Sequence, residues 1–299
     1  MTSVHAEQRK ALLKRYRITS PKGFSLADHP PSDTGGIAID EDEGKLLLQE
    51  GVERLSKLQE ALFANGRWAL LAVFQAKDAG GKDGTIKHVM SGINPQGVSV
   101  TSFKQPGPVE LSHDFLWRVH QAVPMRGHIG IFNRSHYEEV LVTRVHSEAL
   151  DHENLPDEVR AHKFWKHRYR DIRNFEAYLG RQGTIVLKFF LHISKEEQRK
   201  RFLARLDDPD KHWKFSASDL AERGYWDQYQ TAYEDAIAAT ATPDAPWMVV
   251  PGDNKWYARL IVVEAMIQAL EKLPLPVPTL DAEDKAKLQK ARKQLEAET

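Results

Sequence analysis

The chain has 299 residues, of which 41% are hydrophobic and 28% charged, and its formal net charge is zero. This composition is typical of a globular protein with a buried core, and it excludes a disordered chain or one drawn to nucleic acid by a global positive field. The absence of cysteine excludes disulfides, zinc–thiolate sites and thiol catalysis. Apolar runs such as "LIVVEAMI" are too short to span a bilayer, and the N-terminus lacks the apolar stretch of a signal peptide, so we expect a cytoplasmic protein with no membrane partner.

Residues 1–44 mix polar and Pro/Gly-rich pieces, which predicts an irregular arm wrapping the surface. From 45 to 64, leucine and valine recur at helical spacing, and Asn65-Gly66 supplies a stop. Five apolar segments of strand length follow, at 68–75, 98–103, 128–132, 184–193 and 247–251. Helical segments separate or follow them, from about 83, over 113–123, over 137–145, over about 157–180, after Ser194, over about 225–241 and over 255–272.

Strands that alternate with helices predict one α/β domain, a parallel five-stranded sheet with helices on both faces. Ser194 and Glu197 form a capping-box pattern, the polar stretch 207–219 is interpreted as a mobile loop, and residues 273–299 as a charged helical tail. Ligands of such sheets bind at the carboxyl ends of the strands. Two motifs lie at such ends, and we expect them to meet at one edge of the sheet.

The first motif is "VFQAKDAGGKDGTIKHV" at 73–89, which is close to a phosphate-binding Walker A loop, G-x-x-x-x-G-K-[ST]. Ala76 replaces the first glycine and Asp83 replaces the Ser or Thr. The loop still has consecutive glycines, Lys82 and an immediate helix start, a combination that favours phosphate binding by backbone N–H groups and one point charge. The glycines concerned are Gly80, Gly81 and Gly84.

Two carboxylates inside an anion-binding loop require an explanation, because they repel phosphate unless a divalent cation lies between. Magnesium takes few protein carboxylates and keeps phosphate oxygens and waters as its other ligands. Asp78 is therefore a candidate magnesium ligand, or a group that orients the acceptor phosphate. The alternative for Asp78 and Asp83 is a loop-stabilising Asx turn.

The second motif, "IFNRSHYEE", follows the third strand, where a P-loop protein carries its Walker B acid. Asn133 stands there and brings no charge, so the charge of the metal must be matched at Asp78. Arg134 is the stronger candidate of the pair, since its fork of donors suits a nucleotide phosphate.

These residues resemble the family-2 polyphosphate kinases, across roughly residues 45–272. "QAKDAGGKDGTIKHV" is similar to their modified Walker A and "IFNRSHYEEVLVTRV" to their Walker B region, while "SFKQPGPVELSHDFLWRVH", "LHISKEEQRKRF" and "APWMVVPGDNKWYAR" are similar to further family segments. The resemblance implies a P-loop kinase-like α/β/α sandwich, similar to thymidylate kinase, with a helical lid at about 199–219. It also implies phosphoryl transfer between inorganic polyphosphate and purine nucleoside mono- and diphosphates, with Mg²⁺ as cofactor and Mn²⁺ as its alternative. The "KDG" and "NRSHYEE" wording resembles the branch that accepts both kinds of nucleotide.

The resemblance assigns Asp78 and Lys82 to the catalytic loop, Asp78 to the metal, and Arg134 to catalysis and nucleotide anchoring. The full phosphate-binding set comprises Gly80, Gly81, Lys82, Asp83, Gly84 and Thr85 of the loop with Arg201, Arg205, Lys211 and Lys214 of the lid region. The nucleotide-binding set is Asn133, Arg134, Phe103, Trp117 and Arg118. For aromatic residues such as Phe103, Phe115 and Trp117, ordinary core packing is the alternative.

Two other functions are weighed against this one. An ATP-dependent nucleoside monophosphate kinase of the same fold predicts an intact Walker A loop, which the chain lacks. A non-catalytic nucleic-acid binder could use the basic and aromatic segment 160–173, but it leaves the 73–89 loop unexplained. We therefore expect a homo-oligomeric enzyme with no nucleic-acid partner, built as an arm (1–44), a catalytic domain (45–272) and a tail (273–299).

Overall fold

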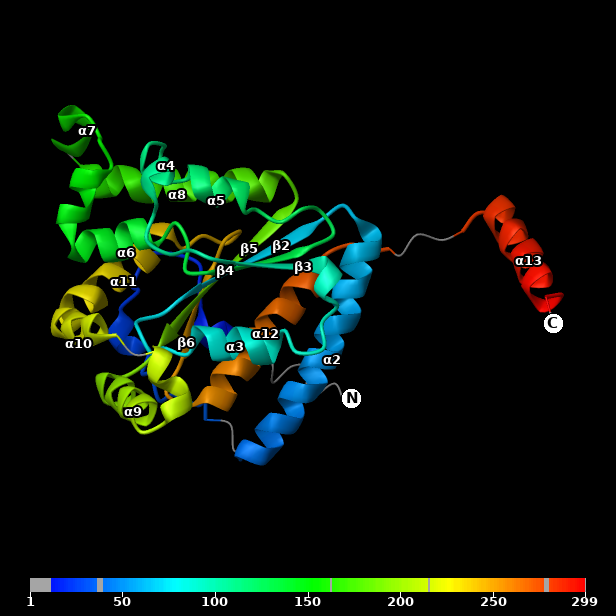
Figure 1. The fold of residues 1–299 in the computed structure, drawn as a ribbon, viewed down its shortest axis with the longest axis horizontal. Helices are drawn as coiled ribbons and strands as arrows, with labels where there is room; N and C mark the ends of the chain where they lie inside the picture. The colour runs from blue at the N-terminus through cyan, green and yellow to red at the C-terminus, as the bar shows by residue number, and fades with distance from the viewer. Residues whose placement is uncertain (1–11, 37–39, 162, 215, 277–279, 299) are drawn as a thin grey trace.

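A six-stranded sheet forms the centre of the computed structural model, which describes residues 12–36, 40–161, 163–214, 216–276 and 280–298 (Figure 1). The strands are β1 (Arg17–Ile18), β2 (Ala69–Gln75), β3 (Val98–Ser102), β4 (Ile129–Asn133), β5 (Thr184–His192) and β6 (Trp247–Pro251). Their order is β1-β6-β5-β2-β4-β3, and only the β1–β6 pair is antiparallel. The five predicted strands and their parallel arrangement are confirmed, but the predicted number is wrong by one, because a two-residue edge strand carries no sequence period.

The helices are α2 (Glu41–Asn65), α3 (Lys82–Val89), α4 (Pro108–Leu111), α5 (Trp117–Gln121), α6 (Glu138–Val145), α7 (Asp157–Ala161), α8 (Phe164–Arg181), α9 (Lys195–Leu206), α10 (Ala217–Glu222), α11 (Trp226–Thr240), α12 (Lys255–Glu271) and α13 (Ala282–Glu296). Several of them cover the two faces of the sheet, whereas α13 has no buried residue and lies apart from it (Figure 1). Within the described part of the chain, none of them is long and apolar enough to cross a membrane.

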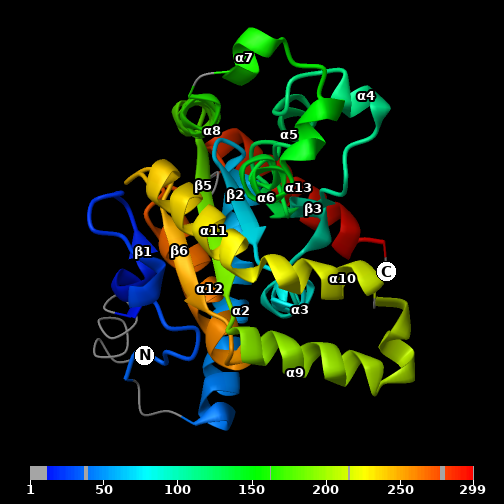
Figure 2. The same ribbon diagram turned by 90° about the vertical axis from the view of Figure 1, so that its left-hand side faces the viewer.

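Consecutive residues of each central strand face opposite layers. Leu70, Ala72 and Phe74 of β2 belong to a core cluster with α2, α3 and α12, whereas Leu71 and Val73 belong to a second cluster with α6, α8 and α11. This alternation follows from the two-residue period of a strand. The result is a three-layer α/β/α sandwich, as predicted, and Figures 1 and 2 show the sheet between the two helical layers.

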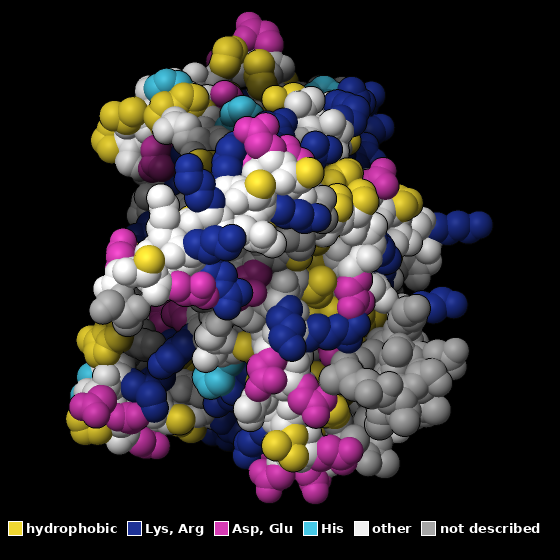
Figure 3. Space-filling model, turned by 90° about the vertical axis from the view of Figure 1, so that its right-hand side faces the viewer, with side chains coloured by type: hydrophobic (Ala, Val, Ile, Leu, Met, Phe, Trp, Pro, Cys, Tyr) yellow, Lys and Arg dark blue, Asp and Glu magenta, His cyan; other side chains and the backbone are white. Residues whose placement is uncertain are grey.

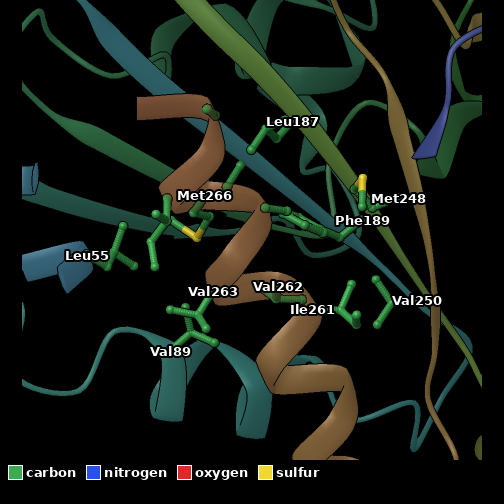
Figure 4. Packing of buried hydrophobic residues seen from close by; sticks show 14 of the residues in the cluster. Leu55, Val89, Leu187, Phe189, Met248, Val250, Ile261, Val262, Val263 and Met266 are labelled. Atoms are coloured by element: carbon green, nitrogen blue, oxygen red, sulfur yellow. The ribbon is translucent and has the colours of Figure 1, made fainter. Parts of the chain in front are cut away.

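Helix α12 fills the centre of the first layer. Ten of its residues from Leu260 to Leu270 are buried, so the helix is apolar nearly all round. Figure 4 shows Ile261, Val262 and Met266 between strand residues such as Phe189 and the helices α2 and α3. Each fully buried side chain of this kind contributes about 1.5–3 kcal/mol relative to an exposed one.

Two predicted helices differ from the observed ones. The helix expected over about 157–180 is divided into α7 and α8, because Lys163 has a left-handed backbone (φ 60°) that a right-handed helix cannot contain. The helix expected over 113–123 is reduced to α5, since Asp114 accepts a bond from the N–H of Leu116 and forms a local turn instead.

The N-terminal arm is only partly irregular. Residues 12–16 are helical, and Leu12, Leu13 and Tyr16 join the first core cluster. The hydroxyl of Tyr16 donates to Asp33 (2.9 Å) and lies 3.0 Å from the Tyr257 hydroxyl of α12. The expectation of an irregular surface arm is therefore wrong for this segment, because three large side chains of the arm complete the core.

The segment between α9 and α11 is more ordered in its local structure than a loop. It contains a 3₁₀ helix (Pro209–Lys214) and the start of α10, so the loop expected over 207–219 is wrong in its local structure, while its mobility stays a prediction. In Figure 2 the chain runs outward through α9 and returns through α10 toward α11. Of the two hydrogen bonds of the predicted capping box, one is confirmed. The side chain of Ser194 accepts from the N–H of Glu197 (3.0 Å), but the N–H of Ser194 donates to Asp253 (2.8 Å) and not to Glu197.

A buried ion pair links the second layer to the segment after β4. Lys188 of β5, which is fully buried, donates to Glu176 of α8 (2.6 Å) and to the carbonyl of Thr240 (2.8 Å). The hydroxyl of Tyr137 donates to the same carboxylate at 2.7 Å. Burial lowers the pKa of Lys188. At Glu176 burial acts to raise the pKa, but Lys188 and His136 together outweigh it and lower the pKa of that carboxyl. The pair thus holds the segment that follows Arg134.

We expect Lys188→Met to lower the free energy of unfolding by about 3–5 kcal/mol, because it leaves the Glu176 carboxylate buried without a counter-charge. The double variant Lys188→Met/Glu176→Leu is expected to lose less free energy of unfolding, because no unpaired carboxylate remains. The carbonyl of Thr240 loses its donor in both variants, and in the double variant the Tyr137 hydroxyl also loses its acceptor, at about 1–3 kcal/mol. Urea denaturation measures both. Equal losses in the single and double variants would contradict the prediction, since the unpaired Glu176 carboxylate would then cost no more than the lost bond of Tyr137.

Candidate active site

A cleft of about 690 Å³ lies at the carboxyl edge of the parallel strands. One wall is the loop between β2 and α3, residues 78–84, and a second comprises residues 102–105 after β3 with Asn133 and Arg134 after β4. Arg205, Lys211, Trp213 and Asp219 of the segment between α9 and α11 close the remaining side. The two motifs singled out in the sequence therefore meet, as predicted.

The β2–α3 loop is shaped by close backbone contacts. A Cβ added at Gly80 would lie 2.5 Å from the Cβ of Ala76, and Gly81 has a left-handed backbone (φ 91°) that favours glycine. No side chain caps the N-terminus of α3, so the first N–H groups of the helix have no capping partner, and the residues that carry them line the cleft. This wall is suited to bind an anion.

Lys82 lies at the start of α3 with its side chain directed back to the strand. Its Nζ donates to the carbonyl of Ala76 at 2.9 Å, which leaves two donors for a ligand. Burial lowers the pKa of Lys82, and so does the neighbouring cation of Arg134, while the carboxylates of Asp78, Glu138 and Asp83 oppose them. An anionic ligand in the cleft would therefore stabilise the charged form of Lys82.

Arg134 lies between two carboxylates. Its Nη2 donates to Asp78 (3.3 Å), and its Nη1 is 3.6 Å from Glu138. Burial acts to lower the pKa of Arg134, but Glu138 and Asp78 outweigh it and raise that pKa. The backbone of Arg134 is left-handed (φ 63°), and its N–H donates to the carbonyl of Phe74 at 3.0 Å.

Asp83 and Asn133 are in direct contact. The Nδ2 of Asn133 donates to Asp83 at 2.8 Å, across the cleft floor. In an ordinary P-loop the hydroxyl is on the loop and the carboxylate on the strand. Here the carboxylate is on the helix start and the neutral amide is at the strand end, so the two departures found in the sequence form one matched pair.

The donors of the cleft fit a magnesium ion. Asp78 and Asp83 both line it, and the amide oxygen of Asn133 stays free of the bond to Asp83. Among the described residues there is no group of three or more His, Cys, Asp or Glu that could hold a metal. Magnesium needs only one or two carboxylates when phosphates and waters supply its other ligands. Asp78 and Asp83 are the residues that would hold it.

Not all of the remaining predicted loop and lid residues line the cleft. Arg205 and Lys211 do. Arg205 lies 3.8 Å from Asp219, and Lys211 is in contact with Asp208. Arg201 lies behind the loop, where its nitrogens donate to Glu197, to the carbonyl of Ala79 and to that of Gly252. Thr85 is buried beneath the loop, and the side chain of Lys214 lies outside the described part of the structure.

The predicted nucleotide-binding residues separate into two groups. Phe103 and Arg118 line a neighbouring cavity of about 350 Å³, which shares Phe103, Lys104, Gln105 and Arg134 with the cleft. Trp117 lines neither cavity and stacks on His113 at 4.0 Å between ring centroids. Phe115 packs against the second core cluster, as the alternative of ordinary core packing predicts.

Sequence reasoning missed several residues of the site. Glu138, which pairs with Arg134, also lines the second cavity. Lys104 and Gln105 line the cleft because they follow β3, and the strand-end rule applied to that strand would have found them. The space-filling view in Figure 3 shows basic and acidic side chains intermingled on one face.

Comparisons with known proteins agree with this geometry. Residues 38–275 match the family model described as polyphosphate kinase 2. The chain is 54% identical over 250 residues to an ADP-polyphosphate phosphotransferase of Rhodopseudomonas palustris, covering 83% of this chain and 86% of the relative. It is 48% identical over 271 residues to an AMP/ADP-polyphosphate phosphotransferase of Meiothermus ruber, covering 89% and 96%. The crystal structure of polyphosphate kinase 2 from Arthrobacter aurescens superposes with a TM-score of 0.83 at 44% identity, over 92% of this chain and 98% of that one.

We expect Asn133→Asp to make the stability of the protein depend on magnesium. The new carboxylate would face Asp83 where the amide now donates, at a cost of about 1 kcal/mol or roughly 2–4 °C of unfolding temperature. Magnesium between the carboxylates should restore the loss, as calorimetry with and without MgCl₂ will measure. Asn133→Ala, which removes the bond without adding charge, is the control. An equal magnesium response in both variants would contradict the pairing.

Proposed function

The chain belongs to the polyphosphate kinase 2 family, and from that membership we propose that it transfers the terminal phosphoryl group between inorganic polyphosphate and a nucleotide. One observation carries the proposal. The cleft has an anion-binding loop on one wall and the lid cations Arg205 and Lys211 on another. A linear chain of phosphates would meet positive groups along its length, without any recognition of a base or ribose on the donor side.

The loop residues supply what this reaction requires. Phosphoryl transfer passes through a loose transition state, so the protein contributes mainly positioning and charge neutralisation. We assign the N–H groups of Gly81, Lys82 and Asp83 and the ammonium of Lys82 to the transferred phosphate. Asp78 and Asp83 hold magnesium, which when bound neutralises charge on the phosphate oxygens.

Arg134 is the residue we assign to the acceptor. It lines both the cleft and the second cavity, so one guanidinium reaches the phosphate of a nucleotide whose base lies beside Phe103. Arg118 stabilises this wall, since it donates to the carbonyl of Lys104 (2.7 Å) and to Glu139 (3.3 Å). We propose purine nucleoside mono- and diphosphates as acceptors, which agrees with the names of the relatives from Rhodopseudomonas palustris and Meiothermus ruber. A cytoplasmic location and a homo-oligomeric state remain part of the proposal.

The alternative, an ATP-dependent nucleoside monophosphate kinase of the same fold, is not favoured. It requires the Walker A hydroxyl that Asp83 replaces, and the relatives at 48–54% identity carry polyphosphate in their names. Trp117, which we expected near the base, gains no support from its position against His113.

The purified protein is expected to form ADP from AMP, and ATP from ADP, when supplied with polyphosphate and magnesium but no ATP. Lys82→Ala and Asp78→Ala should each lower kcat by about 100- to 1,000-fold, as does the loss of other preorganised contacts to transition-state charge. Chromatographic separation of AMP, ADP and ATP measures the products.

Circular dichroism serves as the control that each loop variant is folded. If folded variants turn over at nearly the wild-type rate, the loop has no part in the reaction. If the wild-type protein forms product only when ATP is the donor, the alternative kinase is correct.

Lys211→Ala is expected to raise the KM for polyphosphate more than the KM for nucleotide. Lys211 lines the cleft from the lid and is about half exposed, so its attraction to a polyanion acts through solvent and is screened over about 10 Å at ordinary ionic strength. The effect should therefore shrink when salt is added. Lys57→Ala, on the exposed side of α2, is the matched control. A polyphosphate KM that is unchanged at low salt would exclude Lys211 from donor binding.

A further inference from the structure

Two side chains of α9 hold the backbone of the phosphate-binding loop from behind. The Nε2 of Gln198 donates to the carbonyl of Asp78 at 2.9 Å, and the Nη1 of Arg201 donates to the carbonyl of Ala79 at 3.1 Å. Gln198 is only 4% exposed, so water does not replace its bond to the loop. The predicted motif "LHISKEEQRKRF" contains Gln198, and none of the site assignments above uses it.

The hydrogen bond from Gln198 fixes the orientation of one loop peptide and therefore the direction of its N–H group. The Asp78–Ala79 peptide is planar and trans, so its carbonyl and the N–H of Ala79 point in opposite directions. Gln198 holds the carbonyl and is not among the residues that line the cleft, whereas Ala79 is. In the described part of the chain the N–H of Ala79 has no acceptor, whereas that of Gly80 donates to the carbonyl of Lys77 (2.9 Å).

The backbone of Ala79 is also in a left-handed conformation, with φ at 58°. A residue with a Cβ adopts that conformation at a cost, and surrounding contacts must maintain it. The two bonds from α9 flank this residue, since one holds the peptide before it and the other the peptide after it. Their joint effect is to keep the strained loop open to an anion.

We infer that Gln198 is a positioning residue for phosphoryl transfer, and this inference rests on the function proposed above. It orients the Asp78–Ala79 peptide so that the N–H of Ala79 donates to a phosphate of the polyphosphate donor. Gln198 does not touch the donor and acts only through this peptide.

The orientation of the Gln198 amide is in turn fixed by Arg223. The Nη1 of Arg223, which follows α10, donates to the Oε1 of Gln198 (2.8 Å) and to the carbonyl of Lys195 (3.1 Å). Because Oε1 accepts from Arg223, Nε2 must face the loop. Arg223 thus acts on the loop through Gln198.

The test compares Gln198→Met with Gln59→Met. Methionine matches glutamine in length but forms no comparable hydrogen bond, and Gln59 is equally buried on α2, away from the cleft. Gln198→Met is expected to lower kcat/KM for polyphosphate at least tenfold and to change the KM for nucleotide less than twofold. The rise in unfolding temperature on adding polyphosphate should shrink in Gln198→Met and persist in Gln59→Met.

A double-variant comparison tests the route through Gln198. Arg223→Met alone is expected to lower kcat/KM for polyphosphate. When Arg223→Met is combined with Gln198→Met, kcat/KM is expected to fall less than twofold below that of Gln198→Met. Full additivity of the two losses would contradict that route.

Failure of the inference and failure of the proposed function give different results. If the wild-type protein uses polyphosphate while Gln198→Met and Gln59→Met share its kcat/KM, Gln198 is only structural and the inference is overturned. If Gln198→Met does not fold, polyphosphate kinetics of Arg223→Met decide, since an unchanged kcat/KM there overturns the inference as well. If the wild-type protein does not use polyphosphate at all, the proposed function fails first.

Discussion

The hydrogen bond from the N–H of Arg134 to the carbonyl of Phe74 is the contact on which the geometry of the site depends. Parallel pairing of β2 with β4 aligns Phe74 with Asn133, and this bond extends the pairing one residue beyond the end of β4. Both motif loops therefore leave the sheet at the same level. Two hydrogen bonds hold the residues that follow Arg134 and so maintain its left-handed turn. Gln75 donates to Ser135 (3.0 Å), and Tyr137 donates to the buried Glu176.

Opposite charges balance one another around that turn. Arg134 has a carboxylate on each side, Asp78 and Glu138, and the same two carboxylates counteract the pKa lowering of Lys82. The cations are thus held in place before any phosphate arrives. Burial in turn raises the pKa of Glu138, so this carboxylate is easier to protonate than an exposed one. On the proposed function, a phosphate between Lys82 and Arg134 would compete with these carboxylates, and a divalent cation held at Asp78 would reduce that competition.

The sequence predicts the parts of this arrangement that depend on local pattern. Apolar runs reveal the five central strands, and the glycines with Lys82 reveal the loop, because both signals lie within a few consecutive residues. It does not reveal contacts between distant segments, such as Asn133 with Asp83 or Lys188 with Glu176. Single backbone conformations escape it too: the left-handed φ of Lys163 interrupts a segment whose side-chain pattern is helical throughout. The short strand β1 carries too few residues to show a period.

The lid and the loop act as connected parts rather than as separate ones. Gln198 and Arg201 of α9 hold Asp78 and Ala79, while the Nζ of Lys77 lies 3.5 Å from the ring centroid of Trp226 and contacts Gln230, both on α11. Three consecutive loop residues are therefore attached to the helices on either side of the lid. A donor recognised only by repeated charge has no unique group to set its register. On the proposed function, a fixed relation between the loop and the lid cations would supply that register, because it would determine which phosphate lies opposite Arg134.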